Sequence, residues 1–485
     1  MSKHVNRGLA WIGAASSLVG VLDIVAILII LNNWVSTADY GIATKCIWIF
    51  PILDQATDLG LSAALIQRDD HDDAKISTVF WLNLITGALL FLAIVALAPV
   101  ASAFYEHAIV GSMLIAFGTK LIWQNVYLIP MAMMKRELRF KELSLIRIVA
   151  NLAEFAGKLG FAAAGFGIWC FVLGPLARVL VTAVGVQLRY PWRPRMILRI
   201  REARDYVLFG IKTSGSQMLF QIYTNLDYPV VGYYFGDHQL GLYRLAYEVV
   251  LEPVRIISAV IVDIAFPAFA RLRHHPKKLV KQLVSFTRLN IITVMLYSSV
   301  VFVAADDVLA LVFPDYRAAA PAVRILCAVA LLRAISFVVP PLLDGIGLPH
   351  RTFIYSLIAT LTLPLAFIVG AVVLGDDLQY LSVAVAWAVG YPIAFSALIW
   401  MATTSLQWSV LAYLRAIAGV MACMIAGALA GLGVHVLLAG ELAVLRLGVT
   451  AAVSVLVAGV LLAYTQGISP RSALQSLKGS TPPPG

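Results

Sequence analysis

Charged residues are scarce in this sequence. They make up 13% of its 485 residues, whereas soluble proteins carry about 25%. Hydrophobic residues account for 61% of the chain, and the mean hydropathy is +0.88. This composition excludes a soluble globular domain. It predicts an all-α, polytopic membrane protein whose helices cross the bilayer many times.

Cysteine is also rare. The four cysteines all lie in apolar stretches and are too scattered for a metal-binding motif: Cys46, Cys170, Cys327 and Cys423. Thiols inside a membrane are poor candidates for disulfides, so we interpret them as packing residues. The acidic segment at 68–73 lacks the regular ligand spacing of a metal site. No metal and no other cofactor is therefore expected.

Catalytic and nucleotide-binding motifs are missing as well. The segment Gly210–Thr213 lacks the glycine that precedes lysine in a Walker motif, which argues against ATP hydrolysis by this chain. No Ser/His/Asp arrangement is evident, and the expected extracytoplasmic connections are too short for a glycan polymerase or ligase domain. These absences favour a transporter over an enzyme.

Fourteen apolar stretches approach the length of about 20 residues that a membrane-spanning helix needs. The first is too long for a signal peptide and lacks a small-residue cleavage site. The expected spans are 9–31, 41–65, 77–100, 108–133, 143–163, 167–188, 206–234, 240–270, 282–303, 320–344, 352–374, 380–402, 410–436 and 442–464.

Lysine and arginine are unevenly distributed among the connections between these spans. The N-terminus, the even-numbered connections from the second to the tenth and the C-terminal tail contain lysine or arginine, whereas the odd-numbered connections contain Arg317 alone. The positive-inside rule therefore places both termini in the cytoplasm. The net charge of +10 is explained by this topology, so no nucleic-acid partner is expected.

The two halves of the chain resemble each other. The motif WVSTADYG (34–41) ends the first span, and YFGDHQLG (234–241) ends the seventh; Pro51 and Pro253 then interrupt the following spans. Repeats with broken, polar helices are typical of secondary transporters, which bind substrate between the repeats. We expect an N-lobe at 1–188, a basic linker at 189–205, a C-lobe at 206–403, two peripheral helices at 404–466 and a disordered tail at 467–485. Within the peripheral pair, Gly427 and Gly431 form a GxxxG packing pattern.

Charged and polar residues interrupt several spans. A charge at the bilayer centre costs about 2.5–3.5 kcal/mol, so such side chains are expected to face a polar interior. Two sets share a helix face by their spacing: Arg147, Asn151, Glu154 and Lys158, and Arg244, Glu248, Glu252 and Arg255. The alternative for any single residue is a structural ion pair, as Arg244 could form with Glu248.

Basic residues slightly outnumber acidic ones among these side chains, which predicts a basic central cavity. Arginine and lysine suit phosphate and pyrophosphate, while amide and carboxylate groups suit sugar hydroxyls. Buried carboxylates could take up a coupling proton, and the candidates are Asp54, Asp58 and Asp227. The predicted substrate-binding residues are Lys45, Lys120, Arg147, Lys158, Lys212, Gln217, Gln221, Asn225, Arg244, Glu248, Glu252 and Arg255.

Several segments carry a family resemblance, strongest over 205–271: Leu226-Asp227, GYYFG (232–236), LGLY (240–243), PVRII (253–257) and AFPAFAR (265–271). They resemble the signature of the bacterial polysaccharide transporter family, the Wzx-type flippases of the multidrug/oligosaccharidyl-lipid/polysaccharide superfamily. Family members often have a basic residue near the outer end of the first helix. Asn32 and Asn33 stand there in this chain, so no substrate contact is transferred to that position.

This resemblance implies two six-helix lobes around a central cavity, plus two extra helices. It implies flipping of an undecaprenyl-pyrophosphate-linked repeat unit from the cytoplasmic to the periplasmic leaflet of the inner membrane. The product would serve exopolysaccharide, capsule or O-antigen synthesis, with a polysaccharide polymerase and export machinery as partners.

Two other functions stay open. A cation-coupled drug exporter of the same superfamily would need an acidic cavity, whereas the intramembrane charges have a basic bias. A membrane enzyme of lipid-linked glycan assembly would need a catalytic acid cluster in a loop. Asp306-Asp307 and Asp376-Asp377 are the extracytoplasmic candidates, and both lie in short segments. The sequence therefore favours the flippase.

Overall fold

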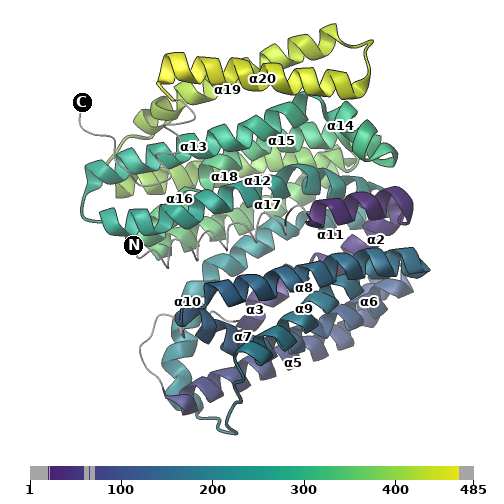
Figure 1. Cartoon of the computed structure of the whole chain (residues 1–485), viewed down its shortest axis with the longest axis vertical. Coiled ribbons are helices and arrows are strands. Elements are labelled where there is room, and N and C mark those ends of the chain that lie inside the picture. The colour runs from purple at the N-terminus through teal and green to yellow at the C-terminus, as the bar shows by residue number, and fades with distance from the viewer. Residues whose placement is uncertain (1–19, 21, 59–64, 66–71, 469–485) are drawn as a thin grey trace. The chain divides into compact units, whose positions relative to one another are not determined.

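The computed structural model describes residues 20, 22–58, 65 and 72–468. It does not describe the side chains of 200–203 and 205–213. In the described part all regular secondary structure is helical, and there is no strand (Figure 1). The all-α membrane fold expected from the composition is confirmed. The expected tail beyond 468 and most of the acidic segment at 68–73 lie outside the described residues.

The chain divides into two compact units, Met1–Gly241 and Leu242–Gly485. The division falls within one long helix, α12 (Gly236–Leu272). The first unit therefore includes helices that follow the basic linker. The lobe boundaries that we expect at 188 and 206 stay a prediction.

The first unit begins with a short apolar helix over Leu22–Asn33. It continues with α2 (Thr37–Ile47), α3 (Phe50–Asp58), α5 (Asp73–Phe104), α6 (Ala108–Gly118), α7 (Lys120–Arg136), α8 (Phe140–Phe161), α9 (Cys170–Arg189), α10 (Ile200–Asn225) and α11 (Asp227–Tyr234). Helices α8 and α9 pack against each other along their lengths. The turn between them contains Gly165 and Gly167, whose φ values of 83° and 55° suit glycine.

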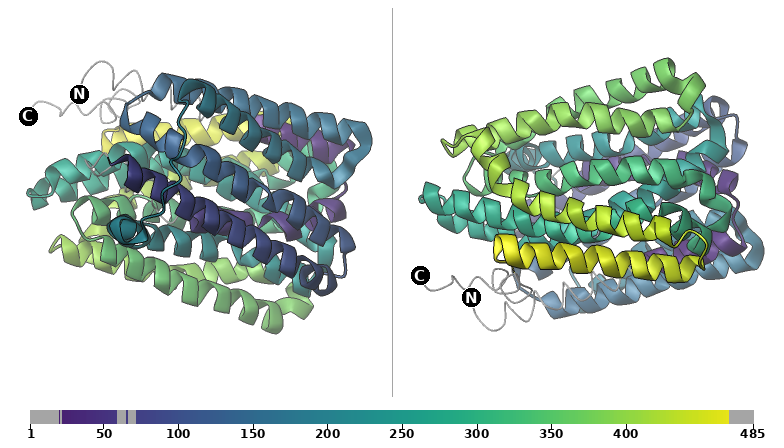
Figure 2. Two further views of the ribbon diagram at one scale, coloured as in Figure 1. Left: turned by 90° about the horizontal axis from the view of Figure 1, so that it is seen from below. Right: turned by 90° about the horizontal axis from the view of Figure 1, so that it is seen from above.

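The second unit holds most of α12. It continues with α13 (Pro276–Val303), α14 (Ala305–Val312), α15 (Ala320–Ser336), α16 (Val339–Gly345), α17 (Pro349–Leu378), α18 (Leu381–Ser405), α19 (Val410–Leu437) and α20 (Ala443–Gln466). Helices α19 and α20 lie side by side at one edge of this unit (Figure 2). The GxxxG pattern faces α20, because a Cβ on Gly427 would lie 2.6 Å from the carbonyl oxygen of Ser454. Arg446 of α20 also pairs with the buried Asp307 of α14.

Nine stretches among the described residues are long and apolar enough to cross a membrane. One of them, Phe140–Arg189, covers two of the expected spans, 143–163 and 167–188. The charged helix α12 is not among the nine, although it is 37 residues long. The protein is therefore a multi-pass membrane protein, and the expected number of fourteen spans is approximate.

The two prolines of the repeat behave differently. Helix α2 ends at Ile47 and α3 begins at Phe50, so the helical structure is interrupted just before Pro51. The expected interruption at Pro253 is wrong, because α12 continues through it. Proline leaves the carbonyl four residues earlier without its helical partner. That carbonyl belongs to Val249, and it accepts a hydrogen bond from the Tyr297 hydroxyl at 2.5 Å, so the helix can continue.

The two repeat motifs contact each other through their glycines. A Cβ added to Gly41 would lie 1.9 Å from the carbonyl oxygen of Asp237, and one added to Gly241 would lie 2.0 Å from that of Thr37. Thr37 and Asp237 each stand four residues before the glycine of their own motif, so the contact is reciprocal. The first turns of α2 and α12 approach this closely because neither glycine has a side chain.

Candidate substrate cavity

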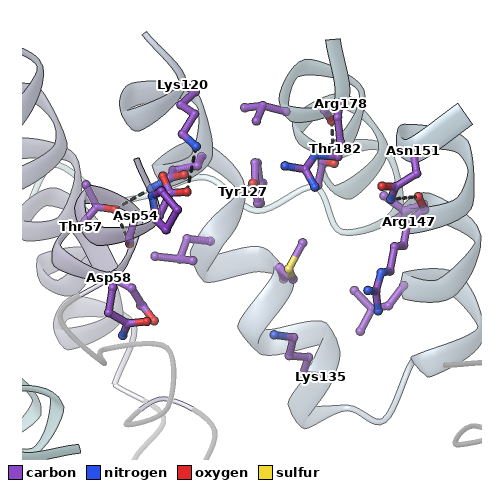
Figure 3. Close-up of a pocket in the computed structure, with 18 of the residues that line it drawn as sticks. Asp54, Thr57, Asp58, Lys120, Tyr127, Lys135, Arg147, Asn151, Arg178 and Thr182 are labelled. Carbon is purple, nitrogen blue, oxygen red and sulfur yellow. Dashed lines mark hydrogen bonds and ion pairs between the residues drawn. The ribbon is translucent and has the colours of Figure 1, made fainter. Parts of the chain in front are cut away.

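A cavity of about 850 Å³ lies within the first unit (Figure 3). Helices α3, α7, α8 and α9 form most of its wall, and Gln221 of α10 adds to it. This volume falls within the range of small-molecule sites. Four cations against two carboxylates give the lining a formal charge of +2: Lys120, Lys135, Arg147 and Arg178 against Asp54 and Asp58.

One side of the cavity is built by α3 and α7. The Lys120 ammonium lies 2.8 Å from Asp54 Oδ2 and above the rings of Phe50 and Phe117, at 5.0 and 4.5 Å from their centroids. Four residues further along α7, the Gln124 amide donates a hydrogen bond to Thr57 Oγ1. The other carboxylate oxygen of Asp54 is buried and has no hydrogen-bond partner among the described residues. The Asp54 side chain as a whole is partly exposed and lines the cavity, so this side offers a carboxylate to a ligand hydroxyl.

The opposite side is built by α8 and α9. Figure 3 shows Arg147, Asn151, Arg178 and Thr182 together there, with Tyr127 between them and the α3–α7 side. The side chains of Asn151 and Thr182 donate to the backbone carbonyls of Arg147 and Arg178 at 2.7 and 2.8 Å, as i, i+4 pairs. Both arginines lie at this same end of the cavity. The cavity has two chemically different ends, one mixed in charge and one basic.

Five residues of the predicted site line this cavity: Lys120, Arg147, Gln221, Asp54 and Asp58. Gln217, Asn225 and Asp227 lie on α10 and α11 outside its lining. The Asn225 amide donates to the carbonyl oxygen of Gln221 at 2.8 Å, and Asp227 is fully buried. The side chain of Lys212 lies outside the described part of the chain.

Lys45 and Lys158 do not line the cavity either, and each is paired with a carboxylate. The Lys45 ammonium lies 2.5 Å from Asp237 Oδ1, and the other oxygen of Asp237 lies 2.6 Å from His107 Nε2. Lys158 lies 2.7 Å from Glu154 Oε1. Both lysines take part in ion pairs, as in the alternative that the sequence left open, and their role in substrate binding stays a prediction.

The charged stripe of α12 forms pairs within its own helix. Arg244 pairs with Glu248 one turn later. Arg255 pairs with Glu252 at 2.8 Å. Pairing does not exclude contact with a substrate, so the role of these four residues in binding stays a prediction.

The predicted site omitted two cations that line the cavity, Arg178 and Lys135. Arg178 belongs to no helical stripe of charged residues, and Lys135 follows the expected span 108–133 and reads as a loop residue. One signal was available for Arg178: an arginine near the middle of the span 167–188 must have a polar environment.

A family model described as "Polysaccharide biosynthesis protein" matches residues 30–321. The chain belongs to this family. It is 26% identical over 350 residues to the teichuronic acid biosynthesis protein TuaB of Bacillus subtilis (strain 168), covering 69% of this chain and 70% of TuaB. It is 22% identical over 378 residues to the lipopolysaccharide biosynthesis protein WzxC of Escherichia coli (strain K12), covering 76% and 75%.

Among solved structures, the fold is similar to that of the lipid II flippase MurJ in an inward closed conformation. The TM-score is 0.74, and the match covers 93% of this chain and 97% of MurJ. At 13% sequence identity this likeness concerns the fold alone. The polysaccharide biosynthesis protein described here thus has the helical fold of a transporter.

Proposed function

We propose that this protein flips lipid-linked oligosaccharides across the bacterial inner membrane. The observation that carries the proposal is a polar, net-basic cavity inside a multi-pass helical protein of the polysaccharide biosynthesis family. TuaB and WzxC are named for the biosynthesis of bacterial polysaccharides, and MurJ is named as a lipid flippase. A transporter that moves a glycan precursor would be consistent with all three, whereas an enzyme would not be.

The cargo that suits the lining is an undecaprenyl-pyrophosphate-linked repeat unit. Arg147 and Arg178 can bind phosphate oxygens through their guanidinium groups. Asp54, Thr57 and Gln124 can hydrogen-bond sugar hydroxyls at the other side. The lipid tail would stay in the bilayer, because it is as apolar as the membrane interior.

The proposed cycle is alternating access from the cytoplasmic to the periplasmic leaflet. Both termini would be cytoplasmic, and the flipped unit would pass to a polysaccharide polymerase and export machinery. Asp54 and Asp58 line the cavity and could couple transport to an ion. The product would serve exopolysaccharide, capsule or O-antigen synthesis.

A leaflet assay tests the proposal. The protein is reconstituted in liposomes that contain a lipid-pyrophosphate-linked oligosaccharide, and enzymatic access to the glycan from outside is followed. The wild-type protein should make the glycan that starts in the inner leaflet accessible to the enzyme outside. Lys120→Ala and Arg147→Ala should slow flipping about tenfold each, since a hydrogen bond to a charged group contributes on the order of 1.5–3 kcal/mol.

The matched control is Arg195→Ala. Arg195 pairs with Asp73 at the exposed surface and does not line the cavity, so this variant should flip at the wild-type rate. If liposomes with the wild-type protein left the glycan in its original leaflet but exported a cationic dye, the flippase proposal would be overturned. Drug export would then be favoured. Equal rates for all variants would retain the flippase and exclude the cavity residues from its mechanism.

A further inference from the structure

Glu154 is a buried carboxylate directly behind the basic end of the cavity. Its side chain is 6% exposed and contacts two cations, the Lys158 ammonium at 2.7 Å and Arg178 Nε at 3.0 Å. Lys158 also lies 3.4 Å from Asp23 Oδ1. We call these four residues, which alternate in sign from the first helix to the cavity wall, the buried charge chain.

The local sequence creates this arrangement. Glu154 and Lys158 stand four residues apart on α8, so they share one face of the helix. Gly174 on α9 provides the space for the lysine, because a Cβ there would lie 2.5 Å from Lys158 Cγ. Arg178 stands one turn after Gly174 and is thereby brought against Glu154. The tight α8–α9 packing and the charge chain depend on the same glycine.

Among the four residues of the buried charge chain, only Arg178 lines the cavity. Its side chain is 44% exposed. Its contact with Glu154 runs through Nε. No other residue in the described part of the protein forms a hydrogen bond or ion pair with this side chain. Its terminal Nη groups are therefore available to a ligand, and two parallel N–H donors match the geometry of a phosphate.

We propose that Arg178 binds the phosphate of the cargo and that Glu154 is the positioning residue that holds its guanidinium at the cavity wall. Lys158 shares the carboxylate, so Glu154 orients Arg178 without fully neutralising it. An arginine fixed in its binding orientation before the ligand arrives loses less conformational entropy on binding. This inference rests on the proposed function and extends it to two residues of the anion site.

The test is the affinity of the purified protein for farnesyl pyrophosphate, measured by calorimetry in detergent. Arg178→Ala should raise the Kd about tenfold, as expected for the loss of a charge-assisted hydrogen bond. Arg178→Lys should recover only part of the affinity, because the ammonium lacks the two parallel donors. Glu154→Gln should raise the Kd severalfold in the wild-type background and should have no further effect in Arg178→Ala.

That non-additivity separates positioning from a purely structural role. If Glu154→Gln weakens binding equally in both backgrounds, Glu154 does not act through Arg178 and the proposal fails. Because Glu154→Gln could also impair folding, Arg178→Ala is decisive by itself: unchanged affinity would overturn the proposal. The matched control is Arg324→Ala, which breaks the pair of Arg324 with Asp306, two residues that do not line the cavity.

The same variants distinguish failure of this site from failure of the flippase assignment. Flipping by the wild type, together with unchanged farnesyl pyrophosphate affinity in Arg178→Ala, would reject the anion site alone. Loss of affinity in Arg178→Ala, in a protein that flips no lipid-linked glycan, would support the anion site and reject the transport function.

Discussion

At the scale of single residues, Lys45 illustrates that a buried cation expected to bind substrate can also have an ion-pair partner within the protein. It is 5% exposed, contacts Asp237 at 2.5 Å and lies 5.1 Å from the centroid of the Tyr105 ring. A sequence shows that such a charge must avoid lipid, but not whether it faces a partner or a cavity. Lys45 faces a partner, and Lys120 faces both a partner and the cavity.

This difference leads to a prediction for Asp237→Asn. The substitution leaves the buried Lys45 ammonium without its counter-charge, and breaking such a pair costs about 3–5 kcal/mol. The melting temperature of the protein in detergent should fall clearly. Lys45→Met should cost less, because it removes the cation and leaves Asp237 beside His107.

The two substitutions together should be less damaging than the sum of their separate effects. Lys45→Met should keep the wild-type affinity for farnesyl pyrophosphate, in contrast to Arg178→Ala. A stably folded Lys45→Met protein with much weaker binding would show that Lys45 contacts the ligand after all.

At the scale of helices, the reciprocal glycine contact explains why the two repeat motifs share a glycine. We predict that Gly41→Ala and Gly241→Ala each destabilise the protein by about 3 kcal/mol or more, since the new methyl group would collide with backbone that cannot move aside cheaply. Thermal unfolding in detergent measures the loss. Gly160→Ala is the control, because a Cβ at this position in α8 meets nothing within 4 Å.

The control should be neutral or stabilising by about 0.5–1 kcal/mol, the usual gain when alanine replaces glycine in a helix. If Gly160→Ala and Gly41→Ala destabilised the protein equally, the glycines would be needed for the flexibility of their helices and not for the close approach of two backbones. The contact between α2 and α12 would then have no special role in stability.

A second prediction at this scale concerns Tyr297 and Pro253. Tyr297→Phe removes the hydrogen bond to the carbonyl oxygen of Val249 and should destabilise the protein by about 1–3 kcal/mol, because a buried acceptor loses its partner. In a Pro253→Ala background the same substitution should cost much less, since alanine restores the helical N–H donor. A double-mutant cycle in thermal stability measures this coupling, and independent effects would contradict the explanation of the unbroken helix.

At the scale of the whole molecule, properties that depend on composition could be predicted from the sequence. The scarcity of charge indicated a multi-pass helical membrane protein, and segments such as 232–236 and 265–271 indicated the family. The cavity was harder to predict, because it depends on which helices pack together. Arg178 joins Arg147 only through the α8–α9 contact, and that contact depends on Gly174, a residue with no visible signal in the sequence.

Topology gives the last prediction. Three apolar stretches, Pro276–Val303, Pro314–Gly345 and Pro349–Leu378, separate the basic segment around Lys278 from the acidic end at Asp377. An odd number of crossings places these two exposed positions on opposite sides of the membrane, and the basic side should be cytoplasmic. Lys278→Cys and Asp377→Cys, each in a background whose four buried cysteines are replaced by alanine, test this with a membrane-impermeant maleimide.

In intact spheroplasts the reagent should label Asp377→Cys at once and Lys278→Cys only after permeabilisation. Labelling of both without permeabilisation would mean that one of the three stretches does not cross, and the helix count would have to change. The reverse pattern would mean that the protein has the opposite orientation in the membrane, with its basic connections outside the cytoplasm. Cargo from the cytoplasm could then not enter the protein from the side of the basic connections. The labelling result therefore also determines which side of the protein faces the cytoplasm, and with it the direction of the proposed lipid flipping through the protein.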